Sequence, residues 1–185
     1  MAKLVVSTHL DDAYQLLCSA KGLPETTGGR RQRGLLLRAS ILFCWLAVEE
    51  SAKTRLREYE VRGYRGSEPR KLSQLIQLCL ALAVAVTGRL DLLQEDQRAS
   101  DDERGEAVRL ALADARLIAR AVDKVRREFD MASFRRFRAM RNALVHCDAG
   151  TLEPLVSDVQ ALYAYVKQAV AGIEGATVVH KAYGI

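Results

Sequence analysis

The stretch from Leu35 to Val48 constrains the fold of this chain more than any other feature, because it is apolar on nearly every side of a helix. A helix that is apolar all round belongs at the centre of a helical protein. We therefore expect a long central helix from Arg31 to Glu60.

The rest of the chain also repeats apolar residues at helical spacing, with glycine-containing breaks between the repeats. The pattern predicts an all-α, single-domain bundle of about five helices over residues 1–173, followed by a C-terminal tail over 174–185. The tail contains Thr177, Val178 and Val179 and is too short to form a sheet. Three other expected helices cover residues 7–20, about 67–87 and 103–129. The chain then bends or restarts near 130–133, and the helix continues to about His146. Thr151 caps the last expected helix.

Length and composition favour a soluble protein of one domain. The chain has 185 residues, of which 49% are apolar, enough for a sizeable core. Its start lacks the pattern of a signal peptide. Leu72–Val86 is about 22 Å long as a helix, shorter than the roughly 30 Å hydrocarbon core of a membrane, so we expect it to be a buried helix. Four widely spaced cysteines read as reduced thiols, so we expect a cytoplasmic protein without a membrane partner: Cys18, Cys44, Cys79 and Cys147.

Positive charge gathers in the second half of the chain, although the formal net charge is only +5. Between residues 124 and 141 only Glu128 and Asp130 oppose seven cations: Lys124, Arg126, Arg127, Arg135, Arg136, Arg138 and Arg141. A run of charge is usually a solvated helix face. Beside a candidate site, it favours binding of a polyanion.

The candidate site is the pair Arg141 and His146, with Asn142 between them. Arginine offers planar donors suited to phosphate oxygens, and histidine gains and loses a proton near neutral pH. On a helix Asn142 and His146 lie about 40° apart, whereas Arg141 and His146 are offset by about 140°. One chain does not bring the two groups together, which predicts a site shared with a second copy.

The string from Arg141 to His146 resembles the Arg-x4-His motif of the HEPN superfamily, and the likeness extends over roughly residues 125–173. Asp148 stands where toxins of HEPN/MNT toxin-antitoxin pairs carry a tyrosine, and is similar to the aspartate of abortive-infection HEPN proteins. The resemblance implies a homodimeric, metal-independent endoribonuclease without a cofactor, with the motif at the end of the penultimate helix. It also implies a toxin or phage-defence role, with a nucleotidyltransferase-type or other antitoxin as a partner.

In this reading Arg141, His146 and Asn142 are catalytic, and Arg135, Arg136 and Arg138 bind RNA. Cleavage would leave 2′,3′-cyclic phosphate ends. Two alternatives stay open: a catalytically inactive module that binds RNA or a partner, and a bundle in which Arg141 and His146 only cap a helix.

Other candidate residues have structural explanations. Glu49 and Lys53 form a favourable i,i+4 pair, so Glu49 and Glu50 need no metal. No histidine has a glutamate three residues before it, as carboxylate-bridged metal bundles require. Cys147 adjoins His146 in sequence and is poorly placed to act with it as a nucleophile.

Overall fold

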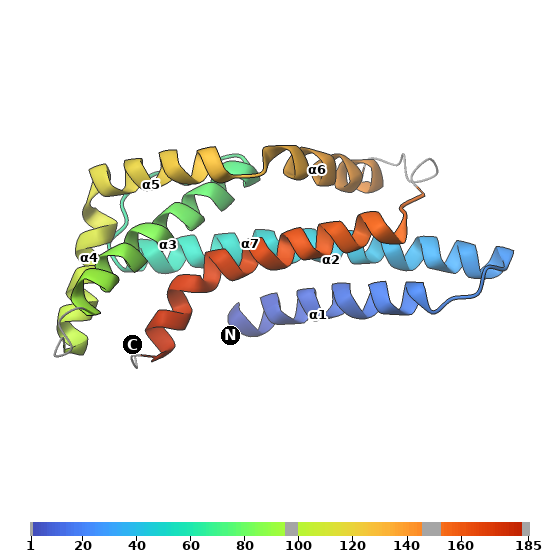
Figure 1. Cartoon of the computed structure of the whole chain (residues 1–185), viewed down its shortest axis with the longest axis horizontal. Coiled ribbons are helices and arrows are strands. Elements are labelled where there is room, and N and C mark those ends of the chain that lie inside the picture. Colours follow the sequence, from blue (N-terminus) through green and yellow to red (C-terminus); the bar gives the residue numbers. More distant parts are fainter. Residues whose placement is uncertain (1, 95–99, 146–152, 183–185) are drawn as a thin grey trace. The chain divides into compact units, whose positions relative to one another are not determined.

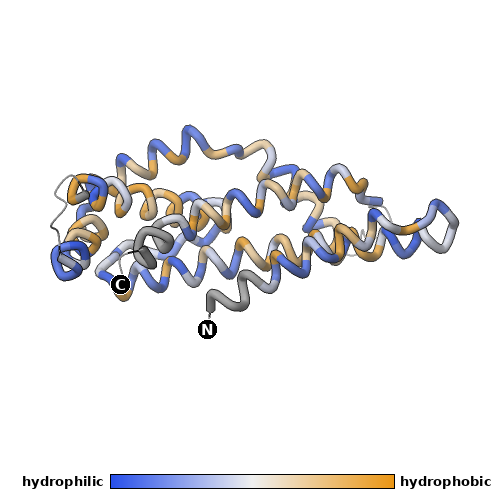
Figure 2. The backbone as a smooth tube through the Cα atoms, turned by 60° about the horizontal axis from the view of Figure 1, so that its bottom comes forward, coloured by the Kyte–Doolittle hydropathy of each residue, from blue (hydrophilic) through white to orange (hydrophobic). Residues whose placement is uncertain are grey.

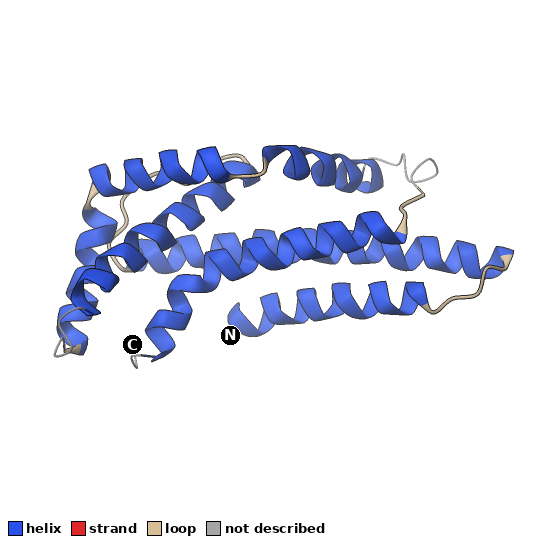
Figure 3. Ribbon diagram, in the orientation of Figure 1, coloured by secondary structure: helices blue, strands red, loops and turns tan. Residues whose placement is uncertain are grey.

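The computed structural model describes residues 2–94, 100–145 and 153–182, and the side chains of 8–93, 100–145 and 153–175. These residues contain seven helices and no strand, which confirms the all-α class (Figure 3). The helices are α1 (Ala2–Lys21), α2 (Thr27–Val61), α3 (Leu72–Gln94), α4 (Asp101–Ala113), α5 (Ala115–Glu128), α6 (Met131–Val145) and α7 (Val156–Ala182) (Figure 1).

The chain divides into two compact units, each built from segments that are distant in sequence. The first contains Met1–Glu50 and Asp130–Ala169, and the second contains Ser51–Phe129 and Val170–Ile185. Helices α2 and α7 therefore contribute one part to each unit. The expected boundary between residues 173 and 174 falls inside α7, whose backbone is helical to Ala182.

The first unit has aromatic contacts between its helices. Trp45 of α2 meets the ring of Phe134 of α6 edge-on, with ring centroids 5.5 Å apart. Phe137 of α6 lies 5.5 Å from the ring of Tyr165 of α7. Both phenylalanines are buried, so these contacts fix which side of α6 faces the core.

In the second unit, small side chains form the contact between α3 and α5. Helix α3 packs against α4 and α5. Ala81 and Ala85 of α3 form a buried cluster with Ala121 and Val125 of α5. Small residues allow α3 and α5 to approach closely. Along α5, hydrophobic and hydrophilic residues alternate from turn to turn, as expected for a helix with one buried side (Figure 2).

Helix α3 is the buried helix that the sequence predicts at Leu72–Val86. By length and composition alone, Leu72–Leu93 is apolar enough to cross a membrane, with a mean hydropathy of 1.7. However, 56% of an 18-residue stretch of this helix is buried inside the protein, and the side chains of Ile76, Leu82 and Val86 are fully buried. It has the burial of a core helix.

The helix expected over residues 103–129 is two helices, and this break accounts for part of the difference from the expected five. The carboxylate of Asp114 accepts hydrogen bonds from the backbone N–H groups of Arg116 and Leu117, at 3.0 and 2.9 Å, and so caps α5. Helix α4 begins earlier than expected because Ser100 and Glu103 form a capping box.

The restart expected near residues 130–133 is confirmed. The backbone N–H of Ser133 donates to the carboxylate of Asp130 at 2.9 Å, at the start of α6. The pKa of Asp130 is lowered by hydrogen bonds from the side chain and the backbone of Ser133. The turn expected after α2 is also present, and Gly63 adopts a φ of 116° there, a value that favours glycine.

Candidate functional site

Helix α6 has a buried side and an exposed side, and the aromatic contacts determine which side faces the core. Phe134 and Phe137 are buried in the first unit, whereas Arg135, Arg136 and Arg138 are exposed. Phe134 and Phe137 lie three residues apart and share a helix face, so their burial turns Arg135 and Arg136 outward, and Arg138 is exposed at the edge of that face. The described part of α6 thus combines a fixed inner side with a basic outer side.

Arg141 and Asn142 lie near the C-terminal end of α6, and both are partly exposed. The Nη1 group of Arg141 donates to Oδ1 of Asn142 at 3.2 Å. This bond restrains the long arginine side chain and uses one of its five N–H donors. The remaining donors and the Asn142 amide N–H groups suit an anionic oxygen.

His146 lies outside the described residues, as do Cys147, Asp148 and Thr151. Helix α6 is described as far as Val145, the residue that precedes His146 in the sequence. The structure thus describes Arg141 and Asn142, and the geometry that joins them to His146 stays a prediction.

The three arginines expected to bind RNA have different surroundings. Arg136 forms a hydrogen-bonded ion pair with Asp158 of α7, and its guanidinium also lies 5.9 Å from the Phe137 ring centroid. Arg135 and Arg138 are exposed and form no ion pair with a described residue. Arg136 therefore links α6 to α7, while the other two remain open to a ligand.

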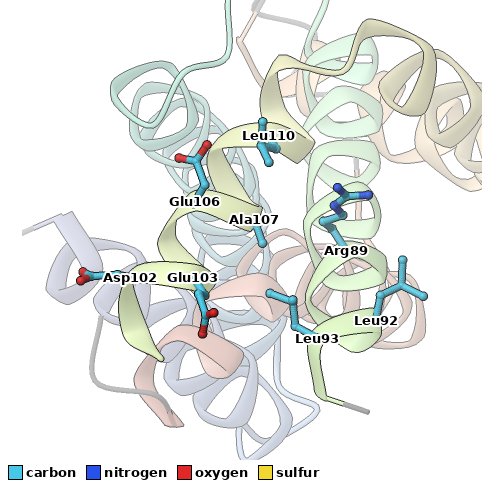
Figure 4. A pocket seen from close by; sticks show the side chains of 8 residues that line it. All are labelled: Arg89, Leu92, Leu93, Asp102, Glu103, Glu106, Ala107 and Leu110. Carbon is cyan, nitrogen blue, oxygen red and sulfur yellow. The ribbon is translucent and has the colours of Figure 1, made fainter. Parts of the chain in front are cut away.

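A hollow of about 490 Å³ lies in the second unit, between α3 and α4 (Figure 4). Its apolar lining comes from Leu92, Leu93, Ala107 and Leu110, and its polar lining from Arg89, Asp102, Glu103 and Glu106. Glu103 already accepts hydrogen bonds from Ser100, and Glu106 is paired with Arg109. These two carboxylates serve helix α4, and the hollow contains no histidine or cysteine.

Other residues considered for chemistry serve the fold. Burial raises the pKa of Cys44 and of Cys79 to about 12, which makes both thiols poor nucleophiles. Glu49 and Glu50 are half-buried, and both Glu49 and Lys53 are engaged in interactions. The described residues contain no group of three potential metal ligands, and the ring of His9 packs beside Phe43.

One basic surface of the second unit was only half predicted, because Lys124 and Arg127 belong to the basic run named from the sequence and Arg116 and Arg120 do not. Arg116, Arg120, Lys124 and Arg127 are all exposed on α5, and we call these four residues the α5 stripe. The spacing in the sequence could have revealed this surface, because the four cations follow each other at intervals of four, four and three residues, which places them on one helix face. The run of cations from residue 124 onward drew attention to charge density instead, and Arg116 and Arg120 lie before it.

Comparison with known proteins yields no match to a family model, a curated protein or a solved structure. The resemblance to HEPN proteins therefore stays an expectation from the sequence.

Proposed function

We propose that this chain is a metal-independent endoribonuclease whose active site combines Arg141, Asn142 and His146 from two copies of the chain. The observation that supports it best is the placement of Arg141 and Asn142. They are hydrogen-bonded to each other at the end of α6, partly exposed, and lie four and five residues before His146. An all-helical fold with a basic outer side on the same helix is the setting that such a site needs.

The proposed reaction uses the ribose 2′-hydroxyl as the nucleophile. His146 accepts its proton as the oxygen attacks the adjacent phosphorus, and the 5′-oxygen of the next nucleotide takes a proton from a protonated His146 or from water as it leaves. Arg141 stabilises the negative charge of the phosphorane, and Asn142 orients the phosphate or the imidazole. The products are a 2′,3′-cyclic phosphate and a 5′-hydroxyl, so DNA is not cut.

Two copies are proposed because Arg141 and His146 are offset by about 140° around a helix. Packing of two α6 ends about a twofold axis would place the arginine of one copy near the histidine of the other. An RNA-cleaving toxin or phage-defence effector is the biological role that fits such an activity, with a possible antitoxin as its partner.

The test is cleavage of a short RNA by wild type, Arg141→Ala and His146→Ala, with and without EDTA. We expect each substitution to reduce the cleavage rate by about 10²–10⁴-fold, a typical contribution for one general acid-base group, while helicity is unchanged. Arg109→Ala serves as the control, because Arg109 is an exposed arginine of α4 that pairs with Glu106. The double variant Arg141→Ala/His146→Ala should lose little more than either single variant.

A second RNA with one 2′-deoxy nucleotide at the mapped cut site tests the chemistry. Cleavage of that bond, or activity that returns only with a divalent metal, would exclude the proposed reaction. RNA binding by wild type without any cleavage would favour the inactive binding module. Sedimentation at micromolar concentration checks the dimer, and an active monomer would rule out a shared site.

A further inference from the structure

We infer that the α5 stripe is a binding surface for the phosphate backbone of single-stranded RNA, in the second unit and distinct from the Arg141 site. Its four residues, Arg116, Arg120, Lys124 and Arg127, are exposed. The inference rests on the proposed function only for the choice of RNA among polyanions.

Helical geometry aligns the four cations. Taking Arg116 as the origin, Arg120, Arg127 and Lys124 lie at about 40°, 20° and 80° around the helix. The stripe extends about 16 Å along the axis, with about one cation per turn. Such a row can follow successive phosphates of an extended strand.

The packing of α5 decides which side faces outward. Ala121 and Val125 are buried against Ala81 and Ala85 of α3, with Leu117 and Val122 packed around them. The apolar side is centred about 140° from the stripe. Because α3 already occupies the apolar side, the stripe is directed away from the core of its unit.

The stripe cations form no ion pair with neighbouring carboxylates that the structure describes, although Arg120 and Arg116 contribute to lowering the pKa of Asp114. On α4, Arg104 pairs with Asp101 and Arg109 pairs with Glu106. On α5, Asp123 pairs with Arg126 at 3.8 Å, outside the stripe, and Asp114 accepts hydrogen bonds from the backbone at the start of the helix. None of the four stripe residues forms an ion pair with any residue that the structure describes.

Folding accounts for only part of this arrangement: Arg127 lies in the last turn of α5, where the helix dipole favours a cation. Cations four residues apart on one helix repel each other. Two such pairs occur in the stripe: Arg116 with Arg120, and Arg120 with Lys124. A ligand of opposite charge would turn this cost into a gain, and three of the four residues are arginines, whose guanidinium matches phosphate geometry.

RNA fits the stripe better than a membrane or a protein partner. Amphipathic helices bind membranes by inserting their apolar side, but the apolar side of α5 is packed on α3. Protein interfaces depend on buried aromatic or aliphatic anchor residues, whereas the stripe contains only cations and the intervening Asp123. A backbone of phosphates needs only aligned, exposed cations.

The experiment measures binding of the full chain to a 20-nucleotide RNA with 2′-O-methyl sugars, which the proposed reaction cannot cut. The stripe variant replaces Arg116, Arg120, Lys124 and Arg127 by glutamine, which keeps helix propensity. The control variant replaces four exposed cations on different segments by glutamine: Lys21, Arg31, Arg57 and Lys167. Both variants lose the same charge, and circular dichroism checks their folding.

We expect the stripe variant to bind at least about tenfold more weakly at about 0.1 M salt, and the control variant less than about threefold. The slope of log affinity against log salt should become shallower by about 2–3 for the stripe variant alone, since each phosphate contact contributes about 0.7. Equal losses in both variants would mean that only net charge matters, and unchanged binding by the stripe variant would exclude the surface. Tighter binding to phosphatidylglycerol vesicles than to RNA, lost in the stripe variant, would make the stripe a membrane surface and also overturn the inference.

Cleavage of unmodified RNA separates this inference from the proposed function. If wild type does not cut RNA but the stripe variant loses binding as expected, the nuclease proposal fails and the stripe stands. If wild type and the stripe variant cut RNA with the same KM, the nuclease proposal stands and the stripe fails.

Discussion

Helices α5 and α6 follow each other in sequence and both are rich in arginine, yet they use their charge differently. The inner side of α6 is anchored by Phe134 and Phe137, and its Arg136 is paired with Asp158 of α7. The inner side of α5 is a close fit of Ala121 and Val125 against α3, and its four stripe cations lack ion-pair partners among the described residues.

This difference shows that charge density alone does not identify a binding surface. What matters is which cations the fold has already paired and which remain available. In α6 the Arg136–Asp158 pair links two helices, whereas the four stripe cations of α5 form no ion pair with a described residue. The stripe of α5 is therefore the surface that we propose for binding, and the proposed chemistry at the end of α6 rests on Arg141, Asn142 and His146 instead.

Truncation of buried side chains should give the largest difference in stability between α6 and α5. Phe134→Ala should destabilise the first unit by about 3–5 kcal/mol, because it leaves a cavity beside Trp45. Val125→Ala should cost about 1–2 kcal/mol, since it removes two methyl groups from a tightly packed site. Urea unfolding followed by circular dichroism measures both values, and equal costs would contradict the different anchoring of the two helices.

Alkylation of the buried cysteines should sharpen the comparison, because Cys44 belongs to the first unit and Cys79 to the second. With pKa values of about 12, both thiols are almost fully protonated at pH 8. We expect iodoacetamide to modify them at least about a hundredfold more slowly than the exposed Cys18, as measured by mass spectrometry. Fast modification of one buried thiol alone would show that its unit opens more readily.

Substitutions of the α6 arginines should differ in their effect on stability, because Arg136 is paired with Asp158 whereas Arg135 and Arg138 form no ion pair with a described residue. Arg136→Gln should destabilise the protein by about 0.2–1 kcal/mol, the usual range for a surface ion pair. Arg135→Gln and Arg138→Gln should leave stability unchanged, and each should lower the salt slope of RNA binding by about 0.7. If Arg136→Gln lowers that slope as much as the other two and leaves stability unaltered, its pairing with Asp158 has no functional consequence.

The smallest effects are expected at the two aspartate caps. The pKa of Asp114 is lowered by hydrogen bonds from the Leu117 and Arg116 backbone and that of Asp130 by Ser133. A carboxyl whose folded pKa is lowered stabilises above its unfolded pKa of about 3.9, and this stability is lost as the pH falls through the folded value. Each Asp→Ala variant should lower Tm by about 2–4 °C between pH 5 and 8.

The deficit of each cap variant should shrink as the pH falls from about 4 through the lowered folded pKa, where the wild-type carboxylate becomes protonated. Asp→Asn variants, which keep a side-chain acceptor, provide the control and should lose less. A deficit that stays constant down to pH 2 would mean that the cap carboxylates are not the cause.

Much of the secondary structure could be predicted from the sequence, because helices depend on local periodicity. The long apolar repeat of α2, the buried α3 and the restart at Asp130 were all predicted. The break at Asp114 was not predicted, because the apolar repeat continues through it. Whether an aspartate caps a new helix or stays on a helix surface depends on how each half packs against α3.

For the site, the sequence supplied the residue types at Arg141, Asn142 and His146, together with the basic run before them. It could not show that Arg141 is hydrogen-bonded to Asn142, or that Arg136 is paired with Asp158, because long side chains choose partners in three dimensions.

What the sequence determined by itself is the helical class and the chemistry its residues offer, since both follow from side-chain type and spacing. What only the tertiary structure decided is the division into two units and the outward side of α5 and α6. That choice follows from burial of Ala121 and Val125 against α3, and of Phe134 and Phe137 in the first unit, because packing of the apolar side leaves the opposite charges exposed.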